Sequence, residues 1–476
     1  MVAEPHELGM IGLGVMGRNL VLNMADHGFP VVGFDKDPAK VDALRREAGA
    51  RPVRAAATLD EFLRLLRAPR AVMMLVPAGG PVDAVVDELR PRLTRDDVII
   101  DGGNSYYRDT DRRVKALAAD GLHFVGVGVS GGEKGARYGP SIMPGGSADA
   151  WERLRPVLEA VSAKVDGSPC VTHLGPGSAG HYVKMVHNGI EYGLMQLIAE
   201  AYDLLKRGLG LDDDRLHTIF ETWNGGELNG YLVEITAAIF LQPDDRGHGR
   251  LIDVIRDEAK QKGTGKWTSQ DAMDLQVPVP TIDAAVAMRD LSGYKAERLA
   301  AERLYPSVPA RFDGDAAAFI EQLGHGLYAG MVLTYAQGMA LLRRASEAYQ
   351  YGLVLDEVAR IWRGGCIIRA RLLEQIRAAF HARPDLPNLL QDPSFAADLH
   401  ARQGHLRAVV QAAARLGIAA PALMASLGYF DGYRTGRLPA NLTQAQRDFF
   451  GSHTYERTDA DGVFHTEWQP GAREAS

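Results

Sequence analysis

A glycine-rich turn near the start of the chain constrains the fold more than any other feature of the sequence. Apolar residues from Leu8 to Ile11 run directly into Gly12-Leu13-Gly14-Val15-Met16-Gly17, and a helix-like segment follows from Asn19 to Ala25. Glycines at this spacing allow a tight turn and a close approach of the backbone, so that a pyrophosphate can bind the free amides at the helix N-terminus. Taken alone, the motif also fits a turn that only packs a helix against a sheet.

An acidic residue after the next strand-like run favours the binding role. Asp35 follows the apolar run from Val31 to Phe34, about 20 residues beyond the glycines, where a carboxylate can accept hydrogen bonds from an adenosine ribose. Together, the strand–turn–helix context and Asp35 predict a dinucleotide site that includes all six residues from Gly12 to Gly17.

Short apolar runs alternate with amphipathic segments through the first part of the chain, which predicts a parallel α/β sheet of the Rossmann type. After Gly180 the pattern changes to long helical periods, and near Arg434 it weakens into a glycine- and proline-containing tail. We therefore expect a dinucleotide-binding domain over 1–178, an all-helical domain over 179–434 and an extended tail over 435–476.

Charge and cysteine content exclude several classes of protein. The net charge is −7 and there are only two cysteines, so neither a nucleic-acid-binding field nor a disulfide scaffold is indicated. Cys170 and Cys366 are far apart and lack metal-ligand spacing, so we expect no metal site. No leader pattern or membrane-spanning run is found, and we expect a cytoplasmic protein without membrane or nucleic-acid partners.

One polar stripe lies on an otherwise apolar segment, Val183 to Ala201. Its members recur at helical spacing and so share one face; they are Lys184, His187, Asn188, Glu191 and Tyr192. A solvated helix face is the alternative, but such faces usually repeat Lys, Arg and Glu. The mixed residue types and the apolar flanks instead favour a buried face that needs polar partners, which a bound substrate could supply.

Two further segments contain more glycine than a connection needs. Gly126 to Gly146 includes Ser130-Gly131-Gly132, and Gln261 to Lys266 includes Lys262 and Thr264. Loops of this kind bring backbone amides to an anion, although ordinary turns would account for half of the glycines.

Taken together, these segments resemble the 6-phosphogluconate dehydrogenases, within the wider β-hydroxyacid dehydrogenases. The likeness spans nearly the whole chain and is carried by the motifs GLGVMG, DGGNSYY, GVSGGEKGARYGPSIMPGG, GHYVKMVHNGIEY, QKGTGKW and RDFFGSHTYER. The resemblance implies oxidative decarboxylation of 6-phosphogluconate to ribulose 5-phosphate in the pentose phosphate pathway. It also implies a homodimer whose tail reaches the partner subunit's site.

Matching positions carry the family's roles onto this chain. Lys184 would be the general base and Glu191 the acid that protonates the enediol. The implied substrate-binding residues are Asn104, Ser130, Gly131, Gly132, His187, Asn188, Tyr192, Lys262, Thr264, Arg289 and, from the other subunit, Arg447 and His453.

Two departures from the family pattern concern the cofactor. This chain has Asp35-Lys36-Asp37 where NADP-using members carry Asn-Arg-Thr, and Val76-Pro77-Ala78-Gly79 where they carry Val-Lys-Ala-Gly. Both changes remove positive charge from the dinucleotide's surroundings, and a carboxylate at Asp35 would repel a 2'-phosphate. We therefore expect Asp35, Lys36, Asp37, Val76, Pro77, Ala78 and Asn104 to bind NAD in preference, with NADP as the alternative.

Two other functions remain open on the residues alone. A β-hydroxyacid dehydrogenase for a smaller substrate would share the glycine turn and the lysine, but would not need QKGTGKW, Arg289 or the tail motif. A dinucleotide-sensing protein that has lost catalysis would not need both Lys184 and Glu191.

Overall fold

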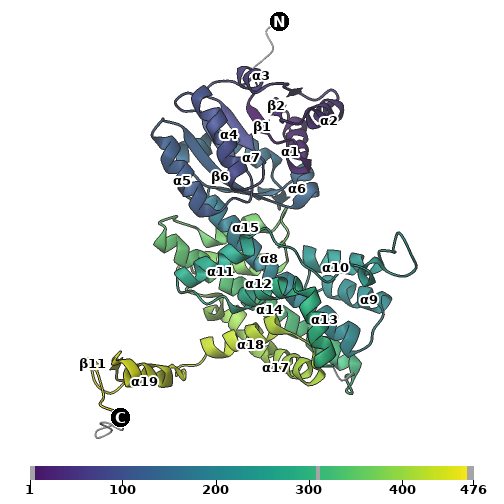
Figure 1. The fold of residues 1–476 in the computed structure, drawn as a ribbon, viewed down its shortest axis with the longest axis vertical. Coiled ribbons are helices and arrows are strands. Elements are labelled where there is room, and N and C mark those ends of the chain that lie inside the picture. The colour runs from purple at the N-terminus through teal and green to yellow at the C-terminus, as the bar shows by residue number, and fades with distance from the viewer. Residues whose placement is uncertain (1–5, 307–310, 469–476) are drawn as a thin grey trace. The chain divides into compact units, whose positions relative to one another are not determined.

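The N-terminal part of the computed structural model, which describes residues 6–306 and 311–468, is built on a seven-stranded sheet (Figure 1). Apolar runs form its strands, which are β1 (Leu8–Ile11), β2 (Val31–Phe34), β3 (Val53–Ala55), β4 (Ala71–Met74), β5 (Val98–Asp101), β6 (His123–Ser130) and β7 (Ser141–Pro144). The order is β3-β2-β1-β4-β5-β6-β7, parallel throughout except that β7 runs antiparallel to β6. The predicted Rossmann-type α/β sheet is confirmed.

Helices cover both faces of this sheet because neighbouring strand residues point to opposite sides. Ile100 packs on the face covered by α1, α2 and α7, whereas Ile99 packs on the face covered by α3, α4 and α5. The helices of this part are α1 (Val15–Asp26), α2 (Pro38–Ala48), α3 (Leu59–Arg64), α4 (Gly80–Leu89), α5 (Tyr107–Ala118), α6 (Gly132–Tyr138) and α7 (Ala148–Val161). Thr58 accepts a hydrogen bond from the Glu61 amide and so caps α3.

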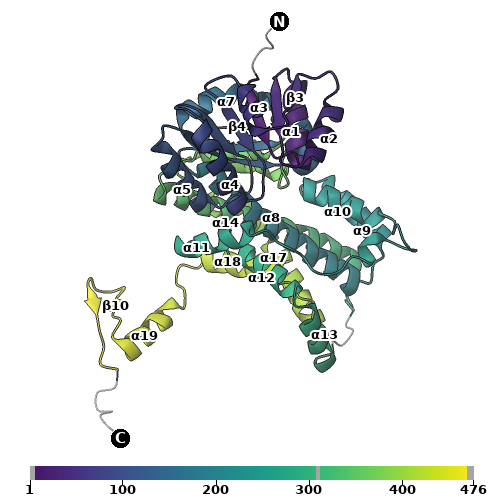
Figure 2. The ribbon, with the colours of Figure 1, turned by 45° about the horizontal axis from the view of Figure 1, so that its top comes forward.

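A helical region follows a short hairpin of β8 (Lys164–Val165) and β9 (Ser168–Pro169). Its helices are α8 (Ala179–Asp203), α9 (Asp213–Asn224), α10 (Tyr231–Leu241), α11 (Thr264–Asp274), α12 (Pro280–Ser292), α13 (Lys295–Leu304), α14 (Ala316–Ala348), α15 (Leu355–Trp362), α16 (Leu372–Ala382), α17 (Pro393–Leu416) and α18 (Pro421–Tyr433). The long helices α8 and α14 pack against each other (Figure 2). The predicted polar stripe therefore lies on a helix packed among other helices.

The chain divides into two compact units, of which the first ends at Ser426 and the second begins at Leu427. The second unit contains the end of α18, then α19 (Ala440–Gly451) and a hairpin of β10 (Tyr455–Glu456) and β11 (Val463–Phe464). The tail is thus more ordered locally than its glycine spacing indicated. The three-domain division at 178 and 434 stays a prediction.

Two strands of the main sheet were not predicted from the sequence pattern. β3 contains Arg54 and is only three residues long, and β7 lies within the glycine-rich segment that we interpreted as loop. In the described ranges no helix is both long and apolar enough to cross a membrane.

Candidate functional site

The glycine turn joins β1 to α1 in the conformation that its sequence demands. Gly12 has φ +92°, a region that residues with a Cβ rarely adopt. A Cβ at Gly17 would overlap the carbonyl oxygen of Gly12, whereas Gly14 faces open space. The turn thus leaves the amides at the start of α1 accessible, at the point in the sheet where the strand order reverses between β1 and β4. These residues fit the pyrophosphate of a dinucleotide.

Acidic groups dominate the end of β2. The Asp35 carboxylate accepts hydrogen bonds from the Leu13 amide (2.8 Å) and from the Asp37 amide (2.9 Å). Lys36 is paired with Glu88 at 2.5 Å, and Asp37 caps α2. Asp35 is therefore attached to the glycine turn itself, beside a lysine whose charge is already paired.

The other predicted dinucleotide contacts lie on loops that follow β4 and β5. Val76 lies against Gly12, while Pro77 and Ala78 are exposed. Asn104 is exposed in the loop between β5 and α5. These loops border the carboxyl ends of the parallel strands, where ligands of such sheets bind.

The polar stripe of α8 is buried, so the solvated-face alternative is wrong. His187 is fully buried, Lys184 is 5% exposed, and Asn188 and Tyr192 are also buried. Glu191 is the most accessible of the five, with its side chain 20% exposed. Among the described residues, the Lys184 amine forms no hydrogen bond. A buried amine of this kind is available to a ligand.

Four predicted residues form one hydrogen-bond chain across three elements. Ser130 Oγ lies 3.3 Å from His187 Nε2, and His187 Nδ1 lies 3.0 Å from Asn188 Oδ1. Asn188 in turn donates to Thr264 Oγ1 at 3.1 Å. Burial, together with the nearby Lys184, lowers the pKa of His187 well below its usual range, so the imidazole is neutral. The neutral ring then donates through Nδ1 and accepts from Ser130.

Burial moves the pKa values of the two proposed proton carriers toward each other. It lowers the pKa of Lys184, an effect that Glu191 and Cys366 partly oppose. It raises the pKa of Glu191, against the influence of Lys184 and Arg289. The arrangement thus favours a neutral amine and a protonated carboxyl, the forms required of a base and an acid.

Cationic and hydroxyl groups gather where α11 begins. The Arg289 guanidinium lies 3.4 Å from the centre of the Tyr192 ring, and Gly265 packs directly against that ring. Thr264 is buried in the first turn of α11, after Gly263 at φ +102°, and Lys262 is exposed just before it. A helix N-terminus flanked by Lys and Arg suits a phosphate group.

A loop that sequence reasoning missed closes the site. It follows α15, and Gly365 approaches so closely that a Cβ at Gly131 would overlap its carbonyl oxygen. Cys366 is fully buried beside Lys184, and burial raises the pKa of its thiol to about 12. No pattern within 363–371 indicates this role, because it depends on contacts with a distant strand.

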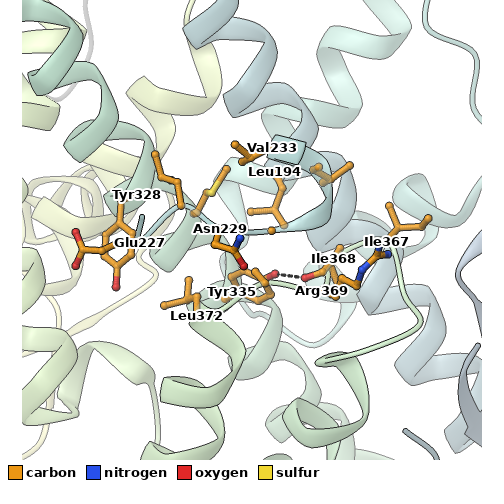
Figure 3. A pocket seen from close by; sticks show the side chains of 15 residues that line it. Leu194, Glu227, Asn229, Val233, Tyr328, Tyr335, Ile367, Ile368, Arg369 and Leu372 are labelled. Carbon is orange, nitrogen blue, oxygen red and sulfur yellow. Dashed lines mark hydrogen bonds between the residues drawn. The ribbon is translucent and has the colours of Figure 1, made fainter. Parts of the chain in front are cut away.

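The far side of this loop is anchored in the helical region, as Figure 3 shows. Tyr335 donates a hydrogen bond to the Ile368 carbonyl at 2.6 Å, drawn as a dashed line in Figure 3. Arg369 also stacks on a ring that lies outside this view, since its guanidinium is 3.7 Å from the Tyr231 ring centre. Tyr335, Ile368 and Arg369 border a pocket that is lined mainly by apolar side chains, such as Leu194. These contacts hold Cys366 and Gly365 in place.

Arg447 and His453 belong to the second unit, in α19 and just after it. Both are exposed, and Arg447 donates to Gln444 at 3.0 Å. Within the described residues, no three His, Cys, Asp or Glu side chains are grouped so that they could hold a metal ion.

The fold and the site define a nicotinamide-dinucleotide-binding oxidoreductase with a helical substrate region. Two family models match: the NAD binding domain of 6-phosphogluconate dehydrogenase over residues 7–175, and its C-terminal domain over 180–468. The chain therefore belongs to the 6-phosphogluconate dehydrogenase family.

Individual relatives agree over nearly their whole length. The chain is 53% identical to a decarboxylating 6-phosphogluconate dehydrogenase of Synechocystis, over 98% of each chain. It is 50% identical to the NADP(+)-dependent decarboxylating enzyme of Bacillus subtilis, over 97% of this chain and 99% of that one. The Plasmodium falciparum 6-phosphogluconate dehydrogenase structure, described with NADP+ and with 6-phosphogluconate, matches with a TM-score of 0.94 at 43% identity and covers 97% of this chain and 100% of its own.

Proposed function

We propose that this chain catalyses the oxidative decarboxylation of 6-phospho-D-gluconate to D-ribulose 5-phosphate and carbon dioxide, a step of the pentose phosphate pathway. The observation that carries the proposal is the presence of Lys184 and Glu191 seven residues apart on the polar face of α8, with Lys184 buried and the Glu191 side chain 20% exposed. Their pKa values are shifted in the directions that a base and an acid require. A reaction that first removes a proton from an alcohol and later returns one to carbon uses both groups.

In the oxidation step, the neutral Lys184 amine takes the proton from the substrate 3-hydroxyl. The bound dinucleotide supplies the acceptor for the hydride that leaves C3. The product is a β-keto acid, and the lysine, now an ammonium, can donate a hydrogen bond to the new carbonyl oxygen.

In the decarboxylation step, the bond between the carboxylate carbon and C2 breaks and its electron pair moves toward the C3 carbonyl. The Lys184 ammonium returns its proton to that oxygen, which yields an enediol. Glu191, whose pKa is raised by burial, then donates a proton to C1 of the enediol, and ribulose 5-phosphate results.

Two sets of residues around Lys184 and Glu191 would orient the substrate. The hydrogen-bond chain of Ser130, His187, Asn188 and Thr264 would hold the sugar acid, with Gly131, Gly132 and Asn104 beside it. Tyr192, Lys262, Thr264 and Arg289 at the start of α11 would hold the phosphate. Arg447 and His453 would complete the phosphate site from the partner subunit of a homodimer.

The tail of the described chain supports an assembly of this kind. Phe449, Phe450 and Leu442 on α19 are more than half exposed. Large apolar side chains grouped on one short helix are typical of a surface that another chain covers.

NAD is the proposed cofactor in preference to NADP. The Asp35 carboxylate occupies the end of β2, and the nearby ammonium groups of Lys36 and Lys40 are already paired with carboxylates. A 2'-phosphate would compete with these carboxylates for the two ammonium groups and would meet repulsion from Asp35. Cytoplasmic localisation remains our expectation, in keeping with two free cysteines.

The test is dinucleotide reduction with 6-phosphogluconate, followed together with carbon dioxide release. We expect kcat/KM with NAD to exceed that with NADP by about tenfold or more. A preference for NADP would contradict the Asp35 argument without touching the chemistry. Turnover of 3-hydroxyisobutyrate but not of 6-phosphogluconate would favour the smaller-substrate enzyme, and turnover of neither would favour a binding protein.

Glu191→Ala separates the last step from the first. We expect it to slow ribulose 5-phosphate formation by about 100-fold, because the enediol loses its proton donor. Incorporation of solvent deuterium into the product is the direct measurement. An unchanged rate with unchanged incorporation would remove Glu191 from this role.

A further inference from the structure

The side chain of Asp271, fully buried in α11, accepts hydrogen bonds from three tyrosines. The hydroxyls of Tyr107, Tyr182 and Tyr349 lie 2.5, 2.6 and 2.9 Å from its oxygens. These tyrosines come from α5, α8 and the end of α14, respectively. One carboxylate thus joins the sheet region to three helices of the helical region.

The hydrogen bonds have a definite direction. Burial raises the pKa values of Tyr107 and Tyr182, so both phenols remain protonated and donate to the carboxylate. Arg108, at the edge of the cluster, lies 3.5 Å from Asp271 and donates to the Tyr107 oxygen at 2.8 Å. A buried charge with several donors is costly to leave unpaired, so these contacts hold the four elements in one arrangement.

Asp271 lies on the same face of α11 as two residues nearer its N-terminus. Thr264, Thr268 and Asp271 follow one another at intervals of four and three residues. Thr264 accepts from Asn188, and Thr268 donates to the Met185 carbonyl at 2.9 Å. With the bond from Tyr182 to Asp271, this face of α11 therefore contacts α8 at three successive positions, and the carboxylate forms the last of them.

The hydrogen bond from Tyr107 to Asp271 connects α11 to α5, which begins just after the loop that carries Asn104. Tyr107 is the first residue of α5, three positions after Asn104. The neighbouring Tyr106 ring lies 4.9 Å from the Trp267 ring of α11. The cluster therefore connects the loop that carries Asn104 directly to the helix that begins at Thr264.

We propose that Asp271 is a positioning residue that sets the spacing between the Asn104 loop and the N-terminus of α11, and thereby the affinity for the phosphorylated sugar acid. This inference rests on the proposed function, which assigns those two segments to opposite ends of the substrate. Asp271 touches neither the reacting atoms nor the glycine turn, so it affects binding of the substrate more than the chemical step or the dinucleotide.

The chain offers a matched control for this inference. Tyr107→Phe removes one hydroxyl from Asp271 and keeps the ring. Tyr351→Phe removes a hydroxyl from the same aromatic cluster, but this hydroxyl bonds Ser178 at 2.8 Å and not Asp271. Asp271→Asn removes the charge itself.

Steady-state kinetics of the full-length variants test the inference. For Tyr107→Phe and Asp271→Asn we expect the KM for 6-phosphogluconate to rise by about tenfold, with kcat within about twofold and the KM for NAD unchanged. Tyr351→Phe should leave all three unchanged. If Asp271→Asn does not fold, Tyr107→Phe alone decides the question.

Two results would overturn the inference. One is a Tyr107→Phe enzyme with a lower melting temperature but an unchanged KM for 6-phosphogluconate, which would make the cluster purely structural. The other is an equal rise in KM for Tyr351→Phe, which would remove any special role for Asp271. A wild-type chain that does not oxidise 6-phosphogluconate would instead refute the proposed function, before the variants are compared.

Discussion

Lys184 lies where a strand and a helix approach unusually closely. A Cβ at Gly128 of β6 would overlap the Lys184 side chain, so the lysine stem is confined while its amine remains available. Lowering the pKa of this amine by burial increases the fraction that is neutral near pH 7. The lysine identity is visible in the sequence, but this confinement is not.

Replacing the lysine tests its role at the residue scale. We expect Lys184→Met to lower kcat by about 1000-fold, because the variant lacks the amine that is proposed to take the hydroxyl proton. The fold should persist, since methionine has a similar length and the amine has no hydrogen-bond partner among the described residues. The measurements are dinucleotide reduction and the thermal melting temperature.

Lys115→Met is the control, because Lys115 is exposed on α5. It should keep full activity. Substantial turnover by Lys184→Met would assign the base to another residue.

In the turn between β1 and α1, one glycine is needed for folding and another is expected to matter for dinucleotide binding. Gly17→Ala should lower the stability of the protein by about 2 kcal/mol or more, because its Cβ would overlap backbone that cannot yield. At Gly14, φ is −62° and an added Cβ would meet open space. Gly14→Ala should therefore leave the melting temperature unchanged. Its KM for the dinucleotide should nevertheless rise about tenfold if the pyrophosphate approaches this backbone.

The two variants thus predict opposite readouts, one in thermal melting and one in dinucleotide binding. Equal stability of both variants would contradict the close contact of Gly17 with Gly12. Unchanged dinucleotide affinity in Gly14→Ala would mean that the ligand does not contact this glycine.

A buried carboxylate joins α8 to the start of α18. The Glu200 carboxylate accepts hydrogen bonds from the Ala422 and Leu423 amides at 2.8 and 2.9 Å. Burial raises its pKa from 4.5 to about 7, despite these two donors. The folded protein therefore binds this proton more tightly than the unfolded chain does, and the contribution of Glu200 to stability falls as pH rises from about 4.5 to about 7.

Urea unfolding at pH 5, 6 and 7.5 checks this sign. Relative to Glu200→Gln, the wild-type free energy of unfolding should fall across the range by an amount on the order of 2–3 kcal/mol. The difference should be constant above the pKa. Parallel pH profiles for the two proteins would show that Glu200 does not titrate in this way.

At the scale of the whole molecule, the proposed exchange of tails makes each site depend on two chains. A subunit with Lys184→Met lacks the base but would supply an intact tail, and a subunit with Arg447→Ala has the base but a defective tail. In a purified hybrid dimer, one of the two sites would be intact. We expect about half of the wild-type activity at low substrate concentration, where each parent dimer is nearly inactive.

Hybrids can be isolated with two different affinity tags, and their mass measured by light scattering. Hybrids without recovered activity would indicate that Arg447 completes the site of its own chain. A monomeric wild-type mass would contradict the dimer.

Local sequence was sufficient for those parts of the protein that depend on neighbouring residues. The turn from Gly12 to Gly17, the strands around it and the single-faced stripe of α8 follow from glycine conformations and from side-chain periods of two and 3.6. The motif resemblance added the residue roles. The sequence did not predict the short strands β3 and β7. They are strands because they pair with β2 and β6, and their own composition does not indicate it.

Tertiary structure decided what depends on residues far apart in the chain. The strand order, the approach of Gly365 to Gly131 and the three tyrosines around Asp271 join segments separated by up to hundreds of positions. The pKa directions of Lys184 and Glu191 belong to this group as well. They result from loss of water, and only the packed assembly of elements removes water from a side chain.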